Sequence, residues 1–227
     1  MSSPPNSSRA AGQTGPNSAS GAFFDELFTG APLMAILRGY SRERTLELAE
    51  RAWELGVRAV EVPVQSQDAV ETLAAVAARA RELDRIAGAG TVVSSDLVRL
   101  AGEAGAAFTV APGFDEAVAD ESDARGMPHL PGVATASEIQ RVLSTGRTWM
   151  KAFPADALGE RWFSGMRGPF PHIRIVATGG MSAGNARHYL DAGADVVAVG
   201  SALGDPQQLP LLAELMSQTR TGDAGHR

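Results

Sequence analysis

The sequence has 227 residues and contains no cysteine. This absence excludes disulfides, thiolate metal sites and a cysteine nucleophile, and it fits a reducing cytoplasm. No apolar run approaches the roughly 18 residues of a membrane-spanning helix. There is no block of like charge and the net charge is −6, so general attraction to nucleic acid or to an anionic membrane is not expected. An anionic substrate would have to be held by a few local donors.

The first 21 residues also lack an apolar segment. Ser, Pro, Gly, Asn and Ala dominate them, and Arg9 is their only charge. This composition predicts a disordered tail over residues 1–21 and not a secretory signal. The rest of the chain shows no linker, so we expect one domain over residues 22–219 and a short flexible tail over 220–227.

From residue 22 the chain alternates between two patterns. A short helix with an apolar face at Phe23, Phe24, Leu27 and Phe28 comes first. Eight strand–helix units follow. The expected strands cover residues 33–37, 59–64, 86–90, 108–111, 129–130, 148–153, 173–177 and 196–199. The expected helices cover residues 42–55, 67–82, 95–104, 114–125, 136–144, 158–166, 182–191 and 207–218. Eight such units predict a single closed (β/α)8 barrel (TIM barrel) of the α/β class, with an open doubly wound sheet as the alternative.

One lysine lies within an expected strand. In the run Thr148-Trp149-Met150-Lys151-Ala152-Phe153-Pro154, strand alternation places Trp149, Lys151 and Phe153 on one face. In a closed barrel, Lys151 would point into the lumen near the carboxyl end of its strand, where such barrels carry their chemistry. A buried ammonium is costly, so buried lysines are usually paired or catalytic. The alternative is an edge-strand lysine that bends out to water.

Other polar residues are expected at the carboxyl ends of the strands. Glu61 lies between Val60 and Val62 and therefore faces away from the helices. Arg38, Thr91, Pro112 and Thr178 each end a strand, and Glu61, Lys151 and Arg38 could satisfy one another electrostatically in one lumen. Alone, Glu61 is more often a paired structural carboxylate, Arg38 could clamp a loop, and the two threonines could be plain strand residues.

Two glycine-containing corners follow the last two strands. Thr178-Gly179-Gly180-Met181-Ser182 comes after the seventh, and Gly200-Ser201 after the eighth. The loops at these places often bind phosphate in (β/α)8 barrels through backbone N–H groups that glycine leaves accessible. The alternative is that these glycines only make tight turns.

Metal chemistry finds little support in the sequence. His129, His172, His188 and His226 have no metal-ligand spacing, so surface or hydrogen-bonded histidines are the expectation. We expect neither a metal nor a cofactor. A lysine Schiff base is then the favoured electron sink.

Taken in order, several short motifs resemble one known family. They are Ala59-Val60-Glu61-Val62, Gly88-Ala89-Gly90-Thr91-Val92, Ala111-Pro112-Gly113, Pro131-Gly132-Val133-Ala134-Thr135, Lys151-Ala152-Phe153-Pro154-Ala155, Thr178-Gly179-Gly180 and Gly200-Ser201. From about Pro32 to Leu203 the chain is similar to the 2-keto-3-deoxy-6-phosphogluconate (KDPG) and 4-hydroxy-2-oxoglutarate (KHG) aldolase family, including its 2-keto-3-deoxy-6-phosphogalactonate branch. The resemblance implies a class I aldolase, usually a trimer, that produces pyruvate and an aldehyde from a phosphorylated keto-deoxy acid.

The resemblance also implies residue roles. Lys151 would be the Schiff-base lysine and Glu61 the proton shuttle. The remaining roles are substrate contacts for Thr91, Pro112, Phe153 and Thr178, and phosphate contacts for Gly179, Gly180, Gly200 and Ser201.

The chain departs from the gluconate-type pattern at Gln65, where those members carry an arginine that grips the pyruvyl carboxylate. An amide there, together with Leu37-Arg38-Gly39, resembles the galactonate branch, whereas Thr178-Gly179-Gly180 and Pro112-Gly113 look like the gluconate type. Arg38 is our expected substitute for the carboxylate clamp. A phosphate-binding barrel isomerase or synthase, and a sugar-phosphate sensor that has lost turnover, are the alternative functions.

Overall fold

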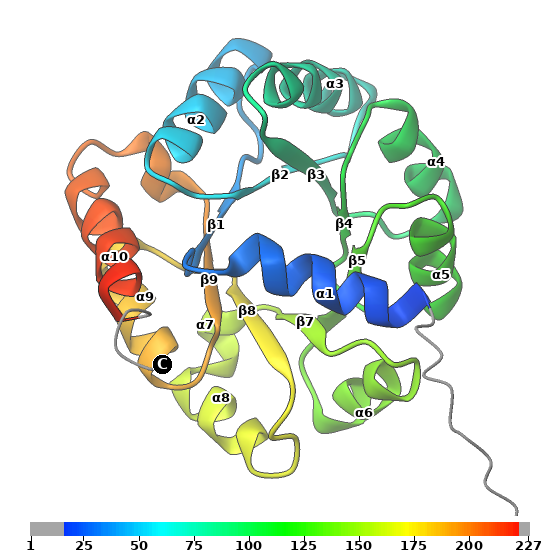
Figure 1. Cartoon of the computed structure of the whole chain (residues 1–227), viewed down its shortest axis with the longest axis vertical. Helices are drawn as coiled ribbons and strands as arrows, with labels where there is room; N and C mark the ends of the chain where they lie inside the picture. Colours follow the sequence, from blue (N-terminus) through cyan, green and yellow to red (C-terminus); the bar gives the residue numbers. More distant parts are fainter. Residues whose placement is uncertain (1–15, 223–227) are drawn as a thin grey trace, which may run out of the picture.

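The computed structural model describes residues 16–222, which form a ring of strands surrounded by helices (Figure 1). The strands are β1 (Leu33–Ile36), β2 (Ala59–Pro63), β3 (Ile86–Gly90), β4 (Thr109–Val110), β5 (His129–Leu130), β6 (Gly132–Val133), β7 (Trp149–Ala152), β8 (Arg174–Thr178) and β9 (Val196–Val199). The helices are α1 (Pro16–Phe28), α2 (Arg42–Glu54), α3 (Gln67–Glu82), α4 (Ser95–Glu103), α5 (Glu116–Ala124), α6 (Ala136–Ser144), α7 (Ala155–Leu158), α8 (Glu160–Arg167), α9 (Ala183–Asp191) and α10 (Leu209–Gly222), with a 3₁₀ turn η1 (Ser201–Gly204).

All strand pairs are parallel, in the order β5-β4-β3-β2-β1-β9-β8-β7-β6. The two ends of this order are consecutive in the chain, because only Pro131 separates β5 from β6. Pro131 has no N–H group to donate to a neighbouring strand. Its carbonyl still accepts a hydrogen bond from the backbone N of Lys151 in β7, at 2.8 Å. β5 and β6 are therefore one strand that pairs with β4 on one side and with β7 on the other. The predicted eight-stranded closed barrel is confirmed.

Strand alternation divides the buried residues into two cores. The lumen core contains Met34, Ile36, Ala59, Phe108, Val110, Leu130, Trp149, Val176, Val196 and Ala198. The core between barrel and helices contains the residues of opposite parity, among them Ala35, Val60, Val62, Met150, Ala152, Ile175, Ala177, Val197 and Val199. The lumen is thus packed with side chains, as expected for an eight-stranded barrel.

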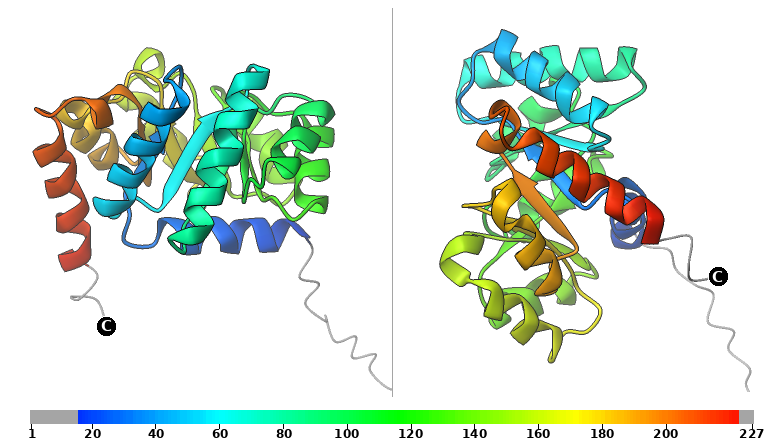
Figure 2. Two further views of the ribbon diagram at one scale, coloured as in Figure 1. Left: turned by 90° about the horizontal axis from the view of Figure 1, so that it is seen from above. Right: turned by 90° about the vertical axis from the view of Figure 1, so that its left-hand side faces the viewer.

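Helix α1 lies across the amino-terminal end of the barrel (Figure 2). Its Phe24 and Phe28 belong to the lumen core, and the Phe28 ring lies 4.9 Å from that of Trp149. Trp149 Nε1 donates to Asp25 Oδ1 at 2.9 Å. The helix begins at Pro16, so residues 16–21 are helical where the composition predicted a tail, and α1 also contacts α5. The rest of the expected tail, residues 1–15, lies outside the described residues.

The helix boundaries follow capping rules. Ser41 caps α2 by accepting from Arg44 N, and Ser66, Ser94, Asp115 and Thr135 cap α3 to α6 in the same way. The expected helix over 158–166 is two helices, because the backbone of Gly159 is left-handed with a φ of 73°. At the other end, α10 continues to Gly222, beyond the expected boundary at residue 219.

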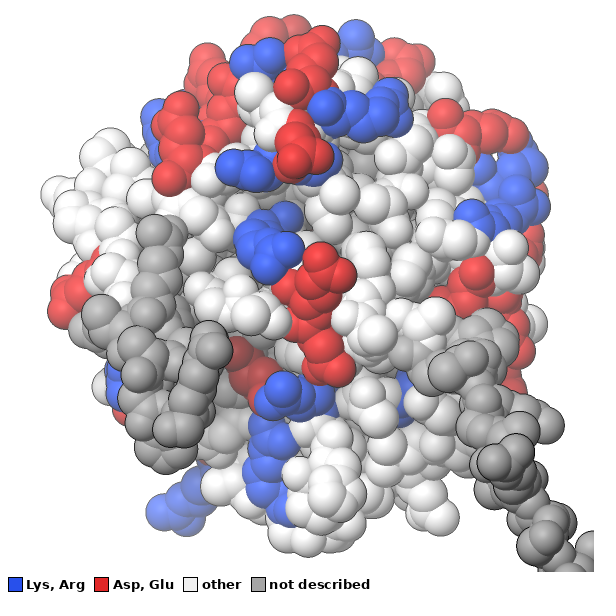
Figure 3. Space-filling model, viewed as in Figure 1, with Lys and Arg blue, Asp and Glu red and all other residues white. Residues whose placement is uncertain are grey.

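The face that carries α1 shows acidic and basic groups side by side instead of a patch of one sign (Figure 3). Asp25 of α1 lies 3.8 Å from Arg174, and Arg58 donates to the Glu26 carbonyl at 2.7 Å. A search of residues 16–222 finds no helix with the length and apolar character needed to cross a bilayer.

Candidate active site

Lys151 and Glu61 both face the lumen. Each is the third residue of its strand, β7 for Lys151 and β2 for Glu61, and the neighbours of each along the chain belong to the outer core. Lys151 is 3% exposed and Glu61 is fully buried. Phe153 lies two residues beyond Lys151, and its ring centroid is 5.5 Å from Lys151 Nζ.

Neither side chain is neutralised by a neighbour. Both carboxylate oxygens of Glu61 are buried without a hydrogen-bond partner. Within residues 16–222, the side-chain nitrogen of Lys151 forms no hydrogen bond or ion pair, and the Arg38 guanidinium bonds to Thr91. No hydrogen bond or ion pair therefore joins Glu61, Lys151 and Arg38 to one another in the described part of the chain. Buried polar groups without partners are rare in native proteins, and a site that awaits a ligand is one reason for them.

Glycines on the neighbouring strands make room for side chains in the lumen. A β-carbon at Gly90 would overlap the Glu61 carboxylate, and one at Gly88 would overlap the Phe108 ring. In β6, Gly132 is the register partner of Lys151, and a β-carbon there would overlap the backbone of Pro112. The absence of a side chain at Gly132 thus lets the loop after β4 approach the lysine strand.

Two threonines present hydroxyl groups at the carboxyl end of the barrel. Thr178, the last residue of β8, is 5% exposed and its Oγ1 has no hydrogen-bond partner. Thr91 follows β3 in the left-handed region with a φ of 61°, which is uncommon for a β-branched residue. Its Oγ1 accepts from Arg38 Nη2 at 3.3 Å. Such strained residues occur often at functional sites.

A cleft of about 480 Å³ opens at this end of the barrel. It is lined by Ile36, Arg38, Tyr40, Phe153, Thr178, Gly179, Gly180, Met181, Ser182, Ala198, Gly200 and Ser201. Because Phe153 lies at the cleft and Lys151 precedes it by two residues on the same strand face, Lys151 lies one step deeper in the lumen.

The two glycine corners form one side of this cleft. Gly179 and Gly180 have φ values of 101° and 71°, which a side chain rarely adopts. A β-carbon at Gly180 would also overlap the side chain of Asp156, and Gly179 O accepts from Asp156 N at 3.2 Å. The loops after β7 and β8 are therefore packed together, which fixes the first corner beside Phe153.

The structure gathers seven of the candidate residues around the cleft: Arg38, Phe153, Thr178, Gly179, Gly180, Gly200 and Ser201. Gln65 is exposed and is not among the lining residues. Pro112 lines a different hollow of about 250 Å³, together with Phe114 and His129. Tyr40 and Ser182 line the cleft but were not predicted, although Tyr40 comes only two residues after the strand-ending Arg38.

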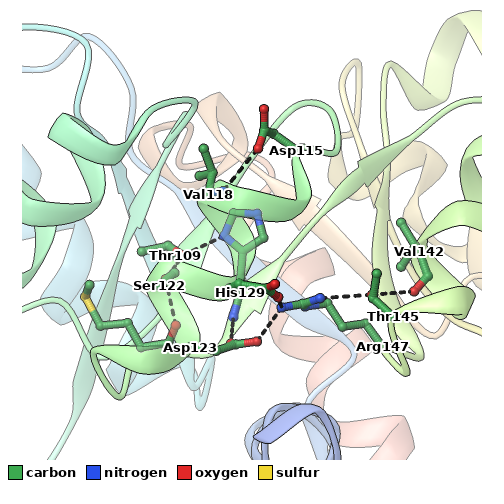
Figure 4. Close-up of polar contacts among 11 residues, drawn as sticks. Thr109, Asp115, Val118, Ser122, Asp123, His129, Val142, Thr145 and Arg147 are labelled. Carbon is green, nitrogen blue, oxygen red and sulfur yellow. Dashed lines mark hydrogen bonds and ion pairs between the residues drawn. The ribbon is translucent and has the colours of Figure 1, made fainter.

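His129 lies outside the lumen in a buried polar network (Figure 4). Its Nδ1 lies 2.7 Å from Thr109 Oγ1, its backbone N–H donates to Asp123, and its Nε2 has no partner. Burial, followed by the charge of Arg147, lowers the pKa of His129 to about 3. Arg147 donates at 2.7 Å to both Asp120 and Asp123. Burial raises the pKa of Asp123, and Arg147 opposes that shift.

Fold and site together define a class of protein, the (β/α)8 barrels with a buried lysine and a carboxylate at the carboxyl end of the strands. The described part of the chain has no group of three His, Cys, Asp or Glu residues able to hold a metal ion. The family model "KDPG and KHG aldolase" matches residues 24–213. The chain belongs to the KDPG and KHG aldolase family, and its members are lyases.

Three relatives illustrate the match. The 2-dehydro-3-deoxy-phosphogluconate aldolase of Treponema pallidum is 37% identical over 154 residues, which cover 64% of this chain and 72% of that protein. A native KDPGal aldolase structure gives a TM-score of 0.75 at 27% identity, covering 84% of this chain and 96% of that one. The KDPG aldolase of Legionella pneumophila, with pyruvate captured as a covalent carbinolamine, gives 0.73 at 26% identity, with coverages of 92% and 99%.

Proposed function

We propose that this chain is a class I aldolase that cleaves a 2-keto-3-deoxy-6-phospho sugar acid to pyruvate and glyceraldehyde 3-phosphate. KDPG is the proposed substrate, and its galactonate epimer is the alternative. The observation that carries the proposal is Lys151, which is buried at the carboxyl end of the lumen without an ion pair. A charged ammonium is costly in such a place, and the neutral amine is the nucleophile that imine formation requires.

The reaction begins with attack of Lys151 Nζ on the C2 ketone of the substrate. The resulting carbinolamine loses water to form a protonated imine, which is the electron sink of the reaction. The Legionella relative, captured with pyruvate as a covalent carbinolamine, supports this assignment. Phe153 contacts the amine from the cleft side and limits the access of water.

Glu61 acts as the proton shuttle. Acting through a water molecule, its carboxylate removes the C4 hydroxyl proton, the C3–C4 bond breaks, and the bonding electrons flow into the imine to give an enamine. Glyceraldehyde 3-phosphate leaves at this stage. Glu61 then returns the proton to C3, and hydrolysis of the new imine releases pyruvate. The two unpartnered oxygens of Glu61 support this role, because they are free to accept the proton.

The surrounding residues orient the substrate. Thr91 and Pro112 line the pyruvate end, and Thr178 contacts the sugar-acid chain through its unpartnered hydroxyl. The backbone N–H groups at Gly179, Gly180 and Gly200, with the Ser201 hydroxyl, hold the phosphate. This arrangement is supported by the cleft, whose lining contains both glycine corners and no carboxylate.

Gluconate-type members of the family carry a carboxylate-binding arginine at the position of Gln65. In this chain Arg38 takes over that role. Its guanidinium lies at the mouth of the lumen, within 3.3 Å of the Thr91 hydroxyl. A bidentate pair with the pyruvyl carboxylate would reach the substrate from β1 instead of β2. The exposed Gln65 contributes at most a neutral contact.

Assembly and location belong to the same proposal. We expect a homotrimer in the cytoplasm with no cofactor, as the family resemblance implies. Light scattering coupled to gel filtration measures the subunit number directly.

The test of the chemistry is covalent trapping. Pyruvate plus borohydride should reduce the imine and label Lys151, which peptide mass spectrometry locates. Lys151→Met keeps the apolar stem and should not be labelled. Labelling at another lysine is not an available outcome, because Lys151 is the one lysine in the sequence. Absence of label in the unmodified protein would therefore refute the Schiff-base chemistry.

The substrate is tested by turnover. Pyruvate release, coupled to a dehydrogenase, gives kcat/KM for the gluconate, the galactonate and the unphosphorylated keto-deoxy acids. KDPG should have the highest value. A higher value for the galactonate epimer would assign the chain to that branch.

A further inference from the structure

Tyr40 forms part of the wall of the candidate cleft. It follows Arg38 by two residues in the loop between β1 and α2, and its side chain is half-buried. It lines the cleft together with Ser182 and Ser201. It also lines a second hollow of about 490 Å³, which lies between the loops after β1 and β2. Tyr40 therefore borders both hollows.

The Tyr40 hydroxyl lies beside η1, the turn that begins at Ser201. A β-carbon at Gly204, the last residue of η1, would be 3.8 Å from Tyr40 Oη and 3.7 Å from Arg44 Nη2. Across residues 16–222, the Tyr40 hydroxyl makes no hydrogen bond. Arg44 uses its other nitrogen, Nη1, in an ion pair with Glu47 at 2.8 Å. One neutral donor and one cationic donor thus meet at the far end of the turn that follows β9.

A phosphate monoester held at the glycine corners can accept further hydrogen bonds. It carries a charge of about −1.5 to −2 at neutral pH and has three strong acceptor oxygens. The two corners approach the cleft from the loops after β8 and β9, whereas Arg38 is the one cation among the lining residues that the structure describes. The loop after β1 approaches from a third direction, and Tyr40 is the hydroxyl that it brings there.

We propose that Tyr40 is a specificity-determining residue for phosphorylated substrates, with its hydroxyl donating to a non-bridging phosphate oxygen held at the glycine corners. This inference rests on the proposed function, since it assigns the phosphate end of that same site. Arg44, which lies beside the same turn at Gly204, adds positive charge there. The loop after β1 thereby selects the phosphorylated terminus of the substrate, while Lys151 and Glu61 act on the keto acid.

The chain contains two tyrosines, which gives a matched pair of variants. Tyr40→Phe removes the hydroxyl and keeps the ring. Tyr189→Phe makes the same change on α9, where the hydroxyl donates to the Ala155 carbonyl at 3.4 Å and is not part of the cleft lining. The measured quantity is the ratio of kcat/KM for the phosphorylated acid to kcat/KM for its unphosphorylated counterpart.

Tyr40→Phe should lower this ratio about tenfold, mainly through KM, because it removes one hydrogen bond to a charged acceptor. It should also raise the inhibition constant of glycerol 3-phosphate, a phosphate monoester without a carbonyl group, by a similar factor. Tyr189→Phe should leave both quantities unchanged. A ratio that stays within twofold of the unmodified value in Tyr40→Phe, or an equal fall in Tyr189→Phe, would overturn the proposal.

Pyruvate trapping separates this inference from the proposed function. Pyruvate has no phosphate, so Tyr40→Phe should be labelled with borohydride as fully as the unmodified protein. If the unmodified protein is labelled and the substrate ratio does not respond to Tyr40→Phe, the assignment of Tyr40 fails and the aldolase chemistry stands. If the unmodified protein is not labelled, both fail together.

Discussion

At the scale of single residues, the most informative feature is a carboxylate without partners. Glu61 is fully buried, and neither of its oxygens accepts a hydrogen bond from the protein. A buried carboxylate that served only stability would be paired, since an unpaired one is costly. The glycine at position 90 leaves the space that this side chain occupies. The proposed role of Glu61 as a proton shuttle accounts for a buried carboxylate that is left unpaired.

This leads to a prediction for Glu61→Gln. The amide has the same shape but cannot take up a proton, so imine formation with pyruvate should persist while turnover falls by about 10²–10⁴-fold. Borohydride labelling and coupled pyruvate release measure the two steps separately. Near-normal turnover would remove Glu61 from the role of proton shuttle, and loss of labelling would show that the residue acts before bond cleavage.

At the scale of elements, α1 completes the lumen core at the amino-terminal end of the barrel. Phe24 is 1% exposed, and its ring centroid lies 6.1 Å from Phe28 and from Phe108 and 6.4 Å from Trp149. These contacts join the helix to strands β4 and β7. The amino-terminal helix is thus part of the barrel's hydrophobic core and not an appendage.

We therefore expect Phe24→Ala to destabilise the whole domain. Removal of a buried phenylalanine ring typically costs about 3–5 kcal/mol of unfolding free energy. The neighbouring Phe23 is half-buried, so Phe23→Ala is the matched control and should cost clearly less. Urea unfolding of both variants measures the difference. Equal losses for the two, or a loss below about 1 kcal/mol for Phe24→Ala, would show that α1 is not required for the core.

At the scale of the whole molecule, polar groups are buried on both sides of the barrel wall but serve different purposes. In the lumen, Glu61, Lys151 and Thr178 are left without partners. Between the barrel and α5, Thr109, Ser122 and His129 bond to one another, and Arg147 ties two aspartates to the same region (Figure 4). In the proposed function the first group contacts the substrate, whereas the second links α5 to the barrel wall.

The second group makes stability depend on pH. The pKa of His129 is 6.5 in a model peptide and about 3 in the folded protein, so the unfolded chain binds a proton first as the pH falls. The contribution of His129 is fully present above pH 6.5 and is lost progressively down to about pH 3. At pH 5 the loss amounts to about 2 kcal/mol. The raised pKa of Asp123 acts in the opposite direction, because the folded state then takes up that proton first.

A substitution of His129 separates its contribution to the pH dependence of stability from that of Asp123. His129→Asn can place its amide nitrogen where Nδ1 donates to Thr109, but it does not titrate. Its unfolding free energy should fall by about 2 kcal/mol less than that of the unmodified protein between pH 7.5 and pH 5. The exposed His172 provides the control, since His172→Asn should leave the pH dependence unchanged. Identical pH profiles for His129→Asn and the unmodified protein would contradict the assignment.

Local sequence patterns determined the architecture of this protein. Alternation of short apolar runs with helices gives eight parallel strands, and the parity of Glu61 and Lys151 against their apolar neighbours already turns both side chains inward. The glycine corners after the last two strands were equally visible. These features depend on backbone periodicity and on residues close in the chain, so one sequence suffices to predict them.

Only the tertiary structure decided which of these groups meet. Arg38 bonds to Thr91 and not to Glu61, Gln65 stays exposed, and Tyr40 joins Ser182 and Ser201 from a loop more than 140 residues away. The sequence also could not show that α1 extends back to Pro16, because α1 packs on the lumen core and on α5, and both are formed by residues that follow it in the chain. The physical reason is common to all of these: periodicity fixes the side of a strand on which a residue lies, whereas its partners depend on how distant loops pack.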